Sequence, residues 1–166
     1  MRKVVLASLM ILVLLSGCTT PKPLVTEHLN SFKSKVLSEH KEITNLKIQM
    51  KPTRIEFDYY LKQKSDQDKD MEIFLKTKEL ILSPNFKKTT IEEKFFKEYS
   101  EDDKRYPDIF VRFFSTKKDQ ADYEYRASYY GPGIEGREGV ESRSIDDYKT
   151  WYFDNFKSLP EPITTK

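Results

Sequence analysis

The sequence predicts an α+β domain that contains an antiparallel sheet of about four to five strands. Apolar residues recur at helical spacing in three segments and alternate with polar residues in others, and proline-containing or polar turns separate these segments. The elements follow the order α-β-β-α-α-β-β. This order suggests a duplicated helix–hairpin unit, although the two halves share little beyond aromatic-rich second strands at 55–60 and 123–130.

The first helix is predicted over residues 27–40. Leu29, Phe32 and Val36 form a stripe at helical spacing, and Thr26 is placed to cap the first turn. Alternating apolar residues then predict a strand over 46–50 and, after the break at Pro52-Thr53, a second strand over 55–61, which contains strong β formers.

The middle of the chain predicts two further helices. Asp70 is a candidate cap for a helix over 71–82, which ends at the Ser83-Pro84-Asn85 turn, and a shorter stripe predicts a helix over 91–99. A strand is the competing interpretation of the first of these segments, because Met71, Ile73 and Leu75 also alternate.

A hairpin is the clearest pattern in the chain. Residues 109–113 and 123–129 alternate on either side of the polar turn 117–120. The face opposite the apolar residues carries Arg112 on the first strand and Asp122, Glu124 and Arg126 on the second. They are available for cross-strand ion pairs, so one face of this hairpin is expected to contact solvent.

The first eighteen residues have the layout of an export signal. A basic start at Arg2-Lys3 precedes an uncharged run from Val4 to Leu15. About 12 residues are too few to cross a bilayer, since at ~1.5 Å rise per residue a spanning helix needs about 20. Ser16-Gly17-Cys18 follows, and Cys18 is the only cysteine, so it has no disulfide partner within the chain.

The segment Leu15-Ser16-Gly17-Cys18 resembles the lipobox of bacterial lipoproteins. The resemblance covers only these residues. It implies removal of a signal peptide over 1–17, a diacylglyceryl thioether on Cys18 and, often, an acyl chain such as palmitate on the new amino terminus. It places the protein on the extracytoplasmic face of the cell membrane. The alternatives are an ordinary signal peptide or a cytoplasmic protein with an apolar start.

The expected organisation is a lipidated tether over 18–25, one globular domain over 26–158 and a flexible tail over 159–166. Loss of Arg2 and Lys3 with the signal leaves 27 basic and 27 acidic residues. The mature chain therefore lacks the basic excess on which nucleic-acid binding depends. Its aromatic residues, 11 Phe, 10 Tyr and one Trp, supply a core.

A glycine-rich stretch over 129–139 holds all four glycines of the mature chain and is the first place to expect function. Aromatic and arginine residues in and after it form a candidate binding surface, because such residues concentrate interface energy. These residues are Tyr129, Tyr130, Arg137, Tyr148, Trp151 and Tyr152. The alternative interpretation is a plain connector between the hairpin and the final aromatic segment.

No spacing in the sequence predicts a metal site, a cofactor site or a catalytic site. Asp66, Asp68 and Asp70 begin like a calcium loop, but Met71 stands where glycine is needed. His28 and His40 are expected to be surface residues, about 120° apart around a helix.

The sequence therefore favours a non-catalytic binding or protein-interaction module at the membrane. One alternative is a cell-envelope hydrolase that uses paired carboxylates, which would stand about 5–9.5 Å apart in a groove. Another is a small accessory or inhibitory subunit of a membrane complex.

Overall fold

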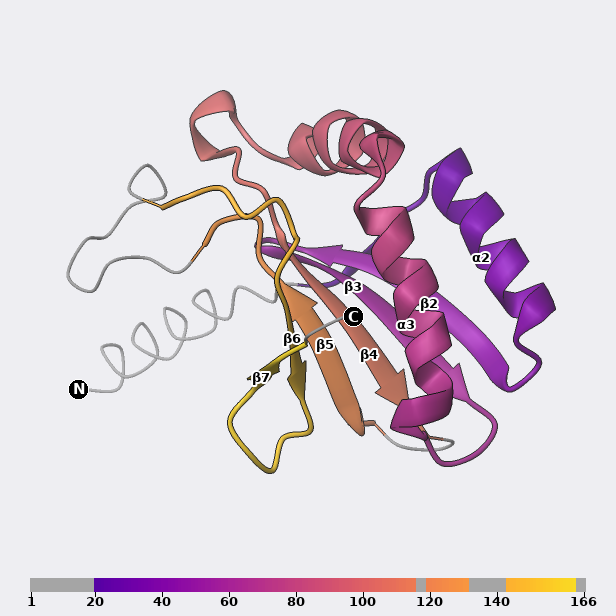
Figure 1. The fold of residues 1–166 in the computed structure, drawn as a ribbon. Helices are drawn as coiled ribbons and strands as arrows, with labels where there is room; N and C mark the ends of the chain where they lie inside the picture. The colour runs from indigo at the N-terminus through magenta and orange to yellow at the C-terminus, as the bar shows by residue number, and fades with distance from the viewer. Residues whose placement is uncertain (1–19, 116–118, 132–142, 164–166) are drawn as a thin grey trace, which may run out of the picture.

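The computed structural model describes residues 20–115, 119–131 and 143–163. These residues form one seven-stranded sheet with helical segments packed on one of its faces (Figure 1). The α+β class predicted from the sequence is confirmed. The predicted signal peptide, Cys18 and Arg137 lie outside the described residues.

The strands follow chain order across the sheet: β1 (Lys22–Pro23), β2 (Ile43–Lys51), β3 (Arg54–Leu61), β4 (Asp108–Phe114), β5 (Tyr123–Ala127), β6 (Trp151–Asp154) and β7 (Glu161–Pro162). The helical segments are α2 (Glu27–Glu39), α3 (Gln67–Ile81), the π-helix η1 (Phe86–Phe95) and the short 3₁₀ turns η2 (Phe96–Glu98) and η3 (Glu101–Asp103). The predicted count of four to five strands is wrong, because β1, β6 and β7 are too short to show a clear alternation.

The predicted antiparallel sheet is in fact mixed, because β3 and β4 pair in parallel. The chain leaves β3 at Leu61, passes through α3 and η1, and returns to begin β4 beside Arg54. A crossover of this length carries the chain back to the end of the sheet where β3 began, so the next strand runs in the same direction. Alternation of side chains does not encode strand direction.

Both long helices begin at capping residues. The Thr26 side chain accepts a hydrogen bond from the Leu29 N–H at 3.2 Å, which confirms the predicted start of α2. The segment for which helix and strand competed is a helix, α3. Its cap is Asp66 rather than the predicted Asp70. Asp70 lies inside the first turn, where its carboxylate accepts hydrogen bonds from the Asp66 N–H at 2.9 Å and the Tyr123 hydroxyl at 2.5 Å.

The core lies between the helices and one face of the sheet and is largely aromatic. Phe74 of α3 stacks on Tyr125 at 4.0 Å between ring centroids and meets Trp151 edge-on at 5.1 Å. Phe86 of η1 lies 6.2 Å from Phe57. The inward side chains of β3 and β4 are fully buried, so this face is closed to solvent.

The two ends of the described chain join the sheet earlier and later than the sequence suggests. Lys22–Pro23 pairs with β2, and Leu24 is buried, so the segment predicted as a tether enters the fold at Lys22. Glu161–Pro162 pairs with β6 inside the predicted tail. Two-residue strands carry no periodic pattern, which is why the sequence does not predict them.

Candidate functional site

The opposite face of the sheet is covered by no helix within the described residues (Figure 1). The strand register aligns its side chains in rows that cross the sheet. One row runs through Gln49, Glu56, Phe110, Arg126 and Tyr152, and the next through Lys47, Asp58, Arg112, Glu124 and Asp154. We call this surface the open face.

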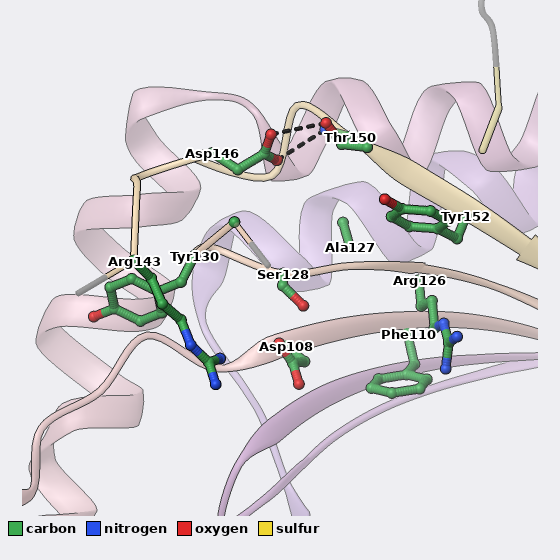
Figure 2. A pocket seen from close by; sticks show the side chains of 11 residues that line it. Asp108, Phe110, Arg126, Ala127, Ser128, Tyr130, Arg143, Asp146, Thr150 and Tyr152 are labelled. Carbon is green, nitrogen blue, oxygen red and sulfur yellow. Dashed lines mark hydrogen bonds between the residues drawn. The ribbon is translucent and has the colours of Figure 1, made fainter. Parts of the chain in front are cut away.

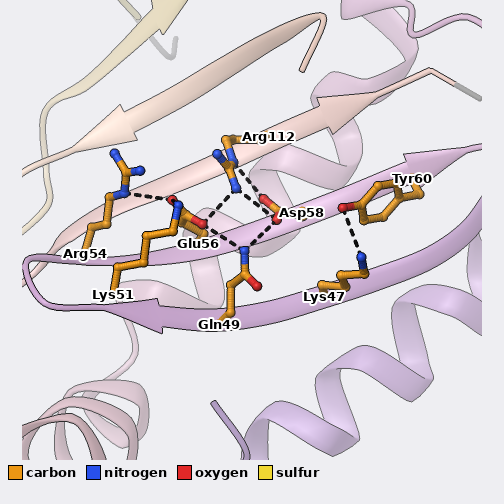
Figure 3. Close-up of polar contacts among 8 residues, drawn as sticks. All are labelled: Lys47, Gln49, Lys51, Arg54, Glu56, Asp58, Tyr60 and Arg112. Carbon is orange, nitrogen blue, oxygen red and sulfur yellow. Dashed lines mark hydrogen bonds and ion pairs between the residues drawn. The ribbon is translucent and has the colours of Figure 1, made fainter. Parts of the chain in front are cut away.

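Arg112 of β4 organises the centre of the open face (Figure 3). Its Nε donates to Asp58 Oδ1 at 2.7 Å, and its Nη2 donates to Asp58 Oδ2 at 2.9 Å and to Glu56 Oε2 at 2.8 Å. A guanidinium fork matches carboxylate geometry, so this bidentate contact fixes both partners. The sequence predicts ion pairs of Arg112 with β5, but its hydrogen-bonded partners lie on β3.

Glu56 is 0% exposed and is surrounded by cations. Its Oε1 lies 2.9 Å from Lys51 Nζ and 2.7 Å from Arg54 Nε, and Gln49 donates to its Oε2 at 2.9 Å. Burial alone would raise the pKa of Glu56. The contacts with Lys51, Arg112 and Gln49 outweigh burial and hold that pKa below its ordinary value.

The other carboxyl groups near Arg112 respond in the opposite direction. Burial raises the pKa of Asp58, which is 2% exposed, despite its hydrogen bonds to Arg112. Burial also raises the pKa of Glu124, which stands opposite Arg112 on β5. Loss of hydration therefore dominates at these two positions.

Aromatic rings extend the open face beyond the charged centre. Tyr60 and Phe114 stack at 4.9 Å, and Lys47 Nζ lies 4.7 Å from the Tyr60 ring. The guanidinium of Arg112 lies 5.5 Å from the centroid of Phe114. In such cation–π contacts the face of the ring attracts the cation. The contact itself requires no hydrogen bond from an N–H group.

Two pockets flank this centre. The first has a volume of about 510 Å³, and Tyr60, Phe114 and Phe156 contribute its aromatic lining beside Asp58 and Glu124. The second has a volume of about 330 Å³ and lies where β4, β5 and the chain before β6 meet. Figure 2 shows Arg126, Arg143 and Asp108 around this second pocket, which we call the arginine pocket.

The residues predicted as a binding surface divide between the core and the arginine pocket. Tyr129, Tyr148 and Trp151 are buried, because their rings pack against other aromatic side chains and α3. Tyr130 and Tyr152 line the arginine pocket, and Tyr152 is 37% exposed. Arg137 lies outside the described residues.

Several residues of the open face were missed by sequence reasoning. Glu56 and Asp58 alternate with buried aromatic residues in β3, and this alternation was the available signal for a charged second face. Gln49, Asp108 and Arg143 give no comparable signal, because only the pairing of distant strands brings them to the site.

Within residues 20–115, 119–131 and 143–163, no three His, Cys, Asp or Glu side chains are grouped so that they could hold a metal ion. Asp66 and Asp70 are engaged by the first turn of α3. The prediction of surface histidines is wrong for His40, which is buried and lies 3.0 Å from both Glu42 Oε1 and Lys76 Nζ. Among the same residues, no helix is long and apolar enough to cross a membrane.

Comparisons with known proteins supply no further assignment. No family model matches the sequence, and neither a curated protein nor a solved structure matches the chain. Function is therefore inferred from the open face and its pockets.

Proposed function

We propose that this protein is a lipid-anchored binding module at the extracytoplasmic face of a bacterial cell membrane, and that its ligand or partner binds on the open face. The observation that carries the proposal is the open face itself. It displays fixed cations and aromatic rings beside two pockets, and no described helix covers it. Fixed side chains lose little conformational entropy on binding.

The arrangement of the central carboxylates supports binding rather than hydrolysis. Glu56 and Asp58 both accept from the same nitrogen of Arg112, so the two carboxylates lie side by side. Every oxygen of both groups, however, already contacts a cation. Both groups are almost entirely buried, so neither is readily available to a substrate.

The lipobox resemblance and the position of β1 together support a location close to the membrane. Lys22, which begins β1, is the fourth residue after Cys18. An extended segment of this length reaches at most ~14 Å. A lipid on Cys18 would therefore keep the edge of the sheet near β1 next to the head groups.

A second candidate function, an envelope hydrolase, is favoured by one observation. Asp58 and Glu124 line the same pocket on either side of Arg112, and burial raises the pKa of each. A carboxyl group with a raised pKa is suited to act as a general acid. Release of soluble fragments from labelled cell-wall polymer by the native chain, and its loss in Glu124→Gln, would support this candidate.

The test of the binding module is crosslinking and affinity capture on living cells, with detergent partitioning of the same samples. We expect the native chain to enter the detergent phase and Cys18→Ala to stay in the aqueous phase, because two acyl chains hold a protein stably at a bilayer. Identical partitioning of the two forms would refute lipid anchoring.

Two matched charge reversals test the role of the open face. Lys47→Glu changes an exposed cation on that face, and Lys88→Glu makes the same change on the helical side of the domain. We expect Lys47→Glu to reduce capture of the partner and Lys88→Glu to leave it unchanged. Equal capture by both variants would remove the open face as the binding surface.

A further inference from the structure

We propose that the arginine pocket binds a small amine that carries a phosphate group. The phosphate would accept hydrogen bonds from Arg126 and Arg143, and the ammonium group would contact Asp108. This inference rests on the proposed binding function and names the ligand class for one part of the open face.

Three elements that are distant in sequence build the pocket. Asp108 begins β4, Arg126 stands near the end of β5, and Arg143 precedes β6. In Figure 2 the Asp108 carboxylate lies between the two guanidinium groups, and all three side chains extend toward the same side of the sheet. The volume of about 330 Å³ suits a small polar molecule, since ligand pockets begin at about 300 Å³.

The charges of this pocket are unusual because they are not paired with one another. Among the residues that the structure describes, neither the guanidinium of Arg126 nor that of Arg143 contacts a carboxylate, and Asp108 has no cation within ion-pair distance. In contrast, Asp146 in the same pocket is occupied, because Thr150 donates to its carboxylate from N–H at 2.9 Å and from Oγ1 at 2.8 Å. Within the described residues, two cations and one anion of this pocket therefore have no charged partner.

These available groups select a phosphate-bearing amine. A phosphate presents oxygens in several directions and can accept from two guanidiniums that approach from different elements, whereas a carboxylate presents two oxygens in one plane. Asp108 would repel a ligand that carries only negative charge and would attract an ammonium group. Phe110, Tyr130 and Tyr152 supply walls that limit the competing solvent.

The pocket lies at the end of the sheet where the chain enters β1. Lys22 pairs with Met50, and this row continues across the sheet to Ala127, which lines the pocket. Four strand spacings separate β1 from β5, which is about 19 Å. A phospholipid head group could reach a pocket at this position. Such a head group and a free phosphorylated amine share the required chemistry, so the experiment must distinguish them.

The test measures binding of defined probes by calorimetry, with the full chain purified in a detergent that lacks phosphate. We expect O-phosphoethanolamine to bind more tightly than inorganic phosphate, and ethanolamine to bind weakly or not at all. Arg126→Gln should weaken O-phosphoethanolamine binding about tenfold or more, because a hydrogen bond between charged groups is lost. Arg105→Gln, an exposed arginine away from the pocket, should leave binding unchanged.

Asp108→Asn tests the ammonium contact. We expect this substitution to abolish the preference for O-phosphoethanolamine over phosphate, whereas a purely structural role for Asp108 would weaken both probes equally. Vesicles of phosphatidylethanolamine in phosphatidylcholine form a second arm. If Arg126→Gln weakens vesicle binding, the pocket takes a lipid head group; if it weakens only soluble binding, the pocket takes a free molecule, and either result supports the inference.

Absence of binding to both the soluble probe and the vesicles would overturn the inference, as would equal affinities of the native chain and Arg126→Gln. The proposed binding function is judged separately, by capture of a partner through Lys47. A chain that captures its partner but ignores the probes would refute the ligand class and leave the binding module standing.

Discussion

Replacement of Arg112 by methionine should be among the most destabilising single changes on the open face. The substitution keeps most of the side-chain length but removes the charge between Glu56 and Asp58. Three hydrogen bonds disappear with it, at 2.7, 2.8 and 2.9 Å. Within the described part of the chain, Asp58 loses its only charged hydrogen-bond donor, while Glu56 keeps Lys51 and Arg54.

The magnitude follows from the burial of the carboxylates that remain. Both are closed to solvent, so they cannot recover hydration when the guanidinium leaves. Removing one partner of a buried ion pair costs about 3–5 kcal/mol. A hydrogen bond to a charged group contributes roughly 1.5–3 kcal/mol, and contributions within one network do not add. We therefore expect a loss of about 3–5 kcal/mol in the free energy of unfolding.

Urea denaturation of the native chain and Arg112→Met, each in the Cys18→Ala background, measures this loss. The variant should also be less destabilised at acid pH. Without the guanidinium, the folded-state pKa of Asp58 rises further above its unfolded value, so protonation favours the fold and stability falls as the pH rises through that raised pKa. Arg105→Met is the control, with an expected change within about 0.5 kcal/mol. A loss below about 1 kcal/mol for Arg112→Met would refute the central role of Arg112.

Three further predictions concern the helical side of the domain. Phe74→Ala should cost about 3–5 kcal/mol in urea denaturation, because it empties the space beside Tyr125 and Trp151; a loss below about 1 kcal/mol would contradict this packing. Asp66→Ala should cost about 0.5–2 kcal/mol and Asp66→Asn much less, because asparagine also caps helices; equal losses in the two variants would argue against capping. Burial raises the pKa of Asp70 despite the hydrogen bond from Tyr123, so the folded state binds the proton more strongly than the unfolded chain. The stability of the native chain relative to Asp70→Asn should therefore fall as the pH rises from near 3.8 through the raised pKa, and parallel pH profiles would show that this shift is absent.

The local elements could be predicted because their signals are local. The start of α2 is marked by Thr26 and by Leu29, which begins the apolar stripe three residues later. The alternation around residues 109–129 marks the hairpin of β4 and β5. The cap of α3 was misplaced by one turn. Asp66 and Asp70 are equivalent in type, and only the fold shows that Asp70 turns inward to Tyr123.

The candidate site could be predicted only in part. Tyr, Trp and Arg near the glycine-rich stretch predicted a binding surface, and of these residues Tyr130 and Tyr152 line a pocket. Composition could not separate these residues from Tyr148 and Trp151, which are buried. A large aromatic side chain suits a core and an interface equally well, so residue type alone does not assign it to either.

The sequence by itself determined the α+β class, the first helix and the hairpin, because backbone periodicity and capping act over a few neighbouring residues. It also supplied the lipobox resemblance, which depends on four consecutive residues. Only the tertiary structure decided that β3 and β4 run in parallel, that Arg112 joins Glu56 and Asp58, and that Arg126, Arg143 and Asp108 surround one pocket. These features depend on the path of a long crossover and on the register between distant strands, and neither is expressed in the pattern of any one segment.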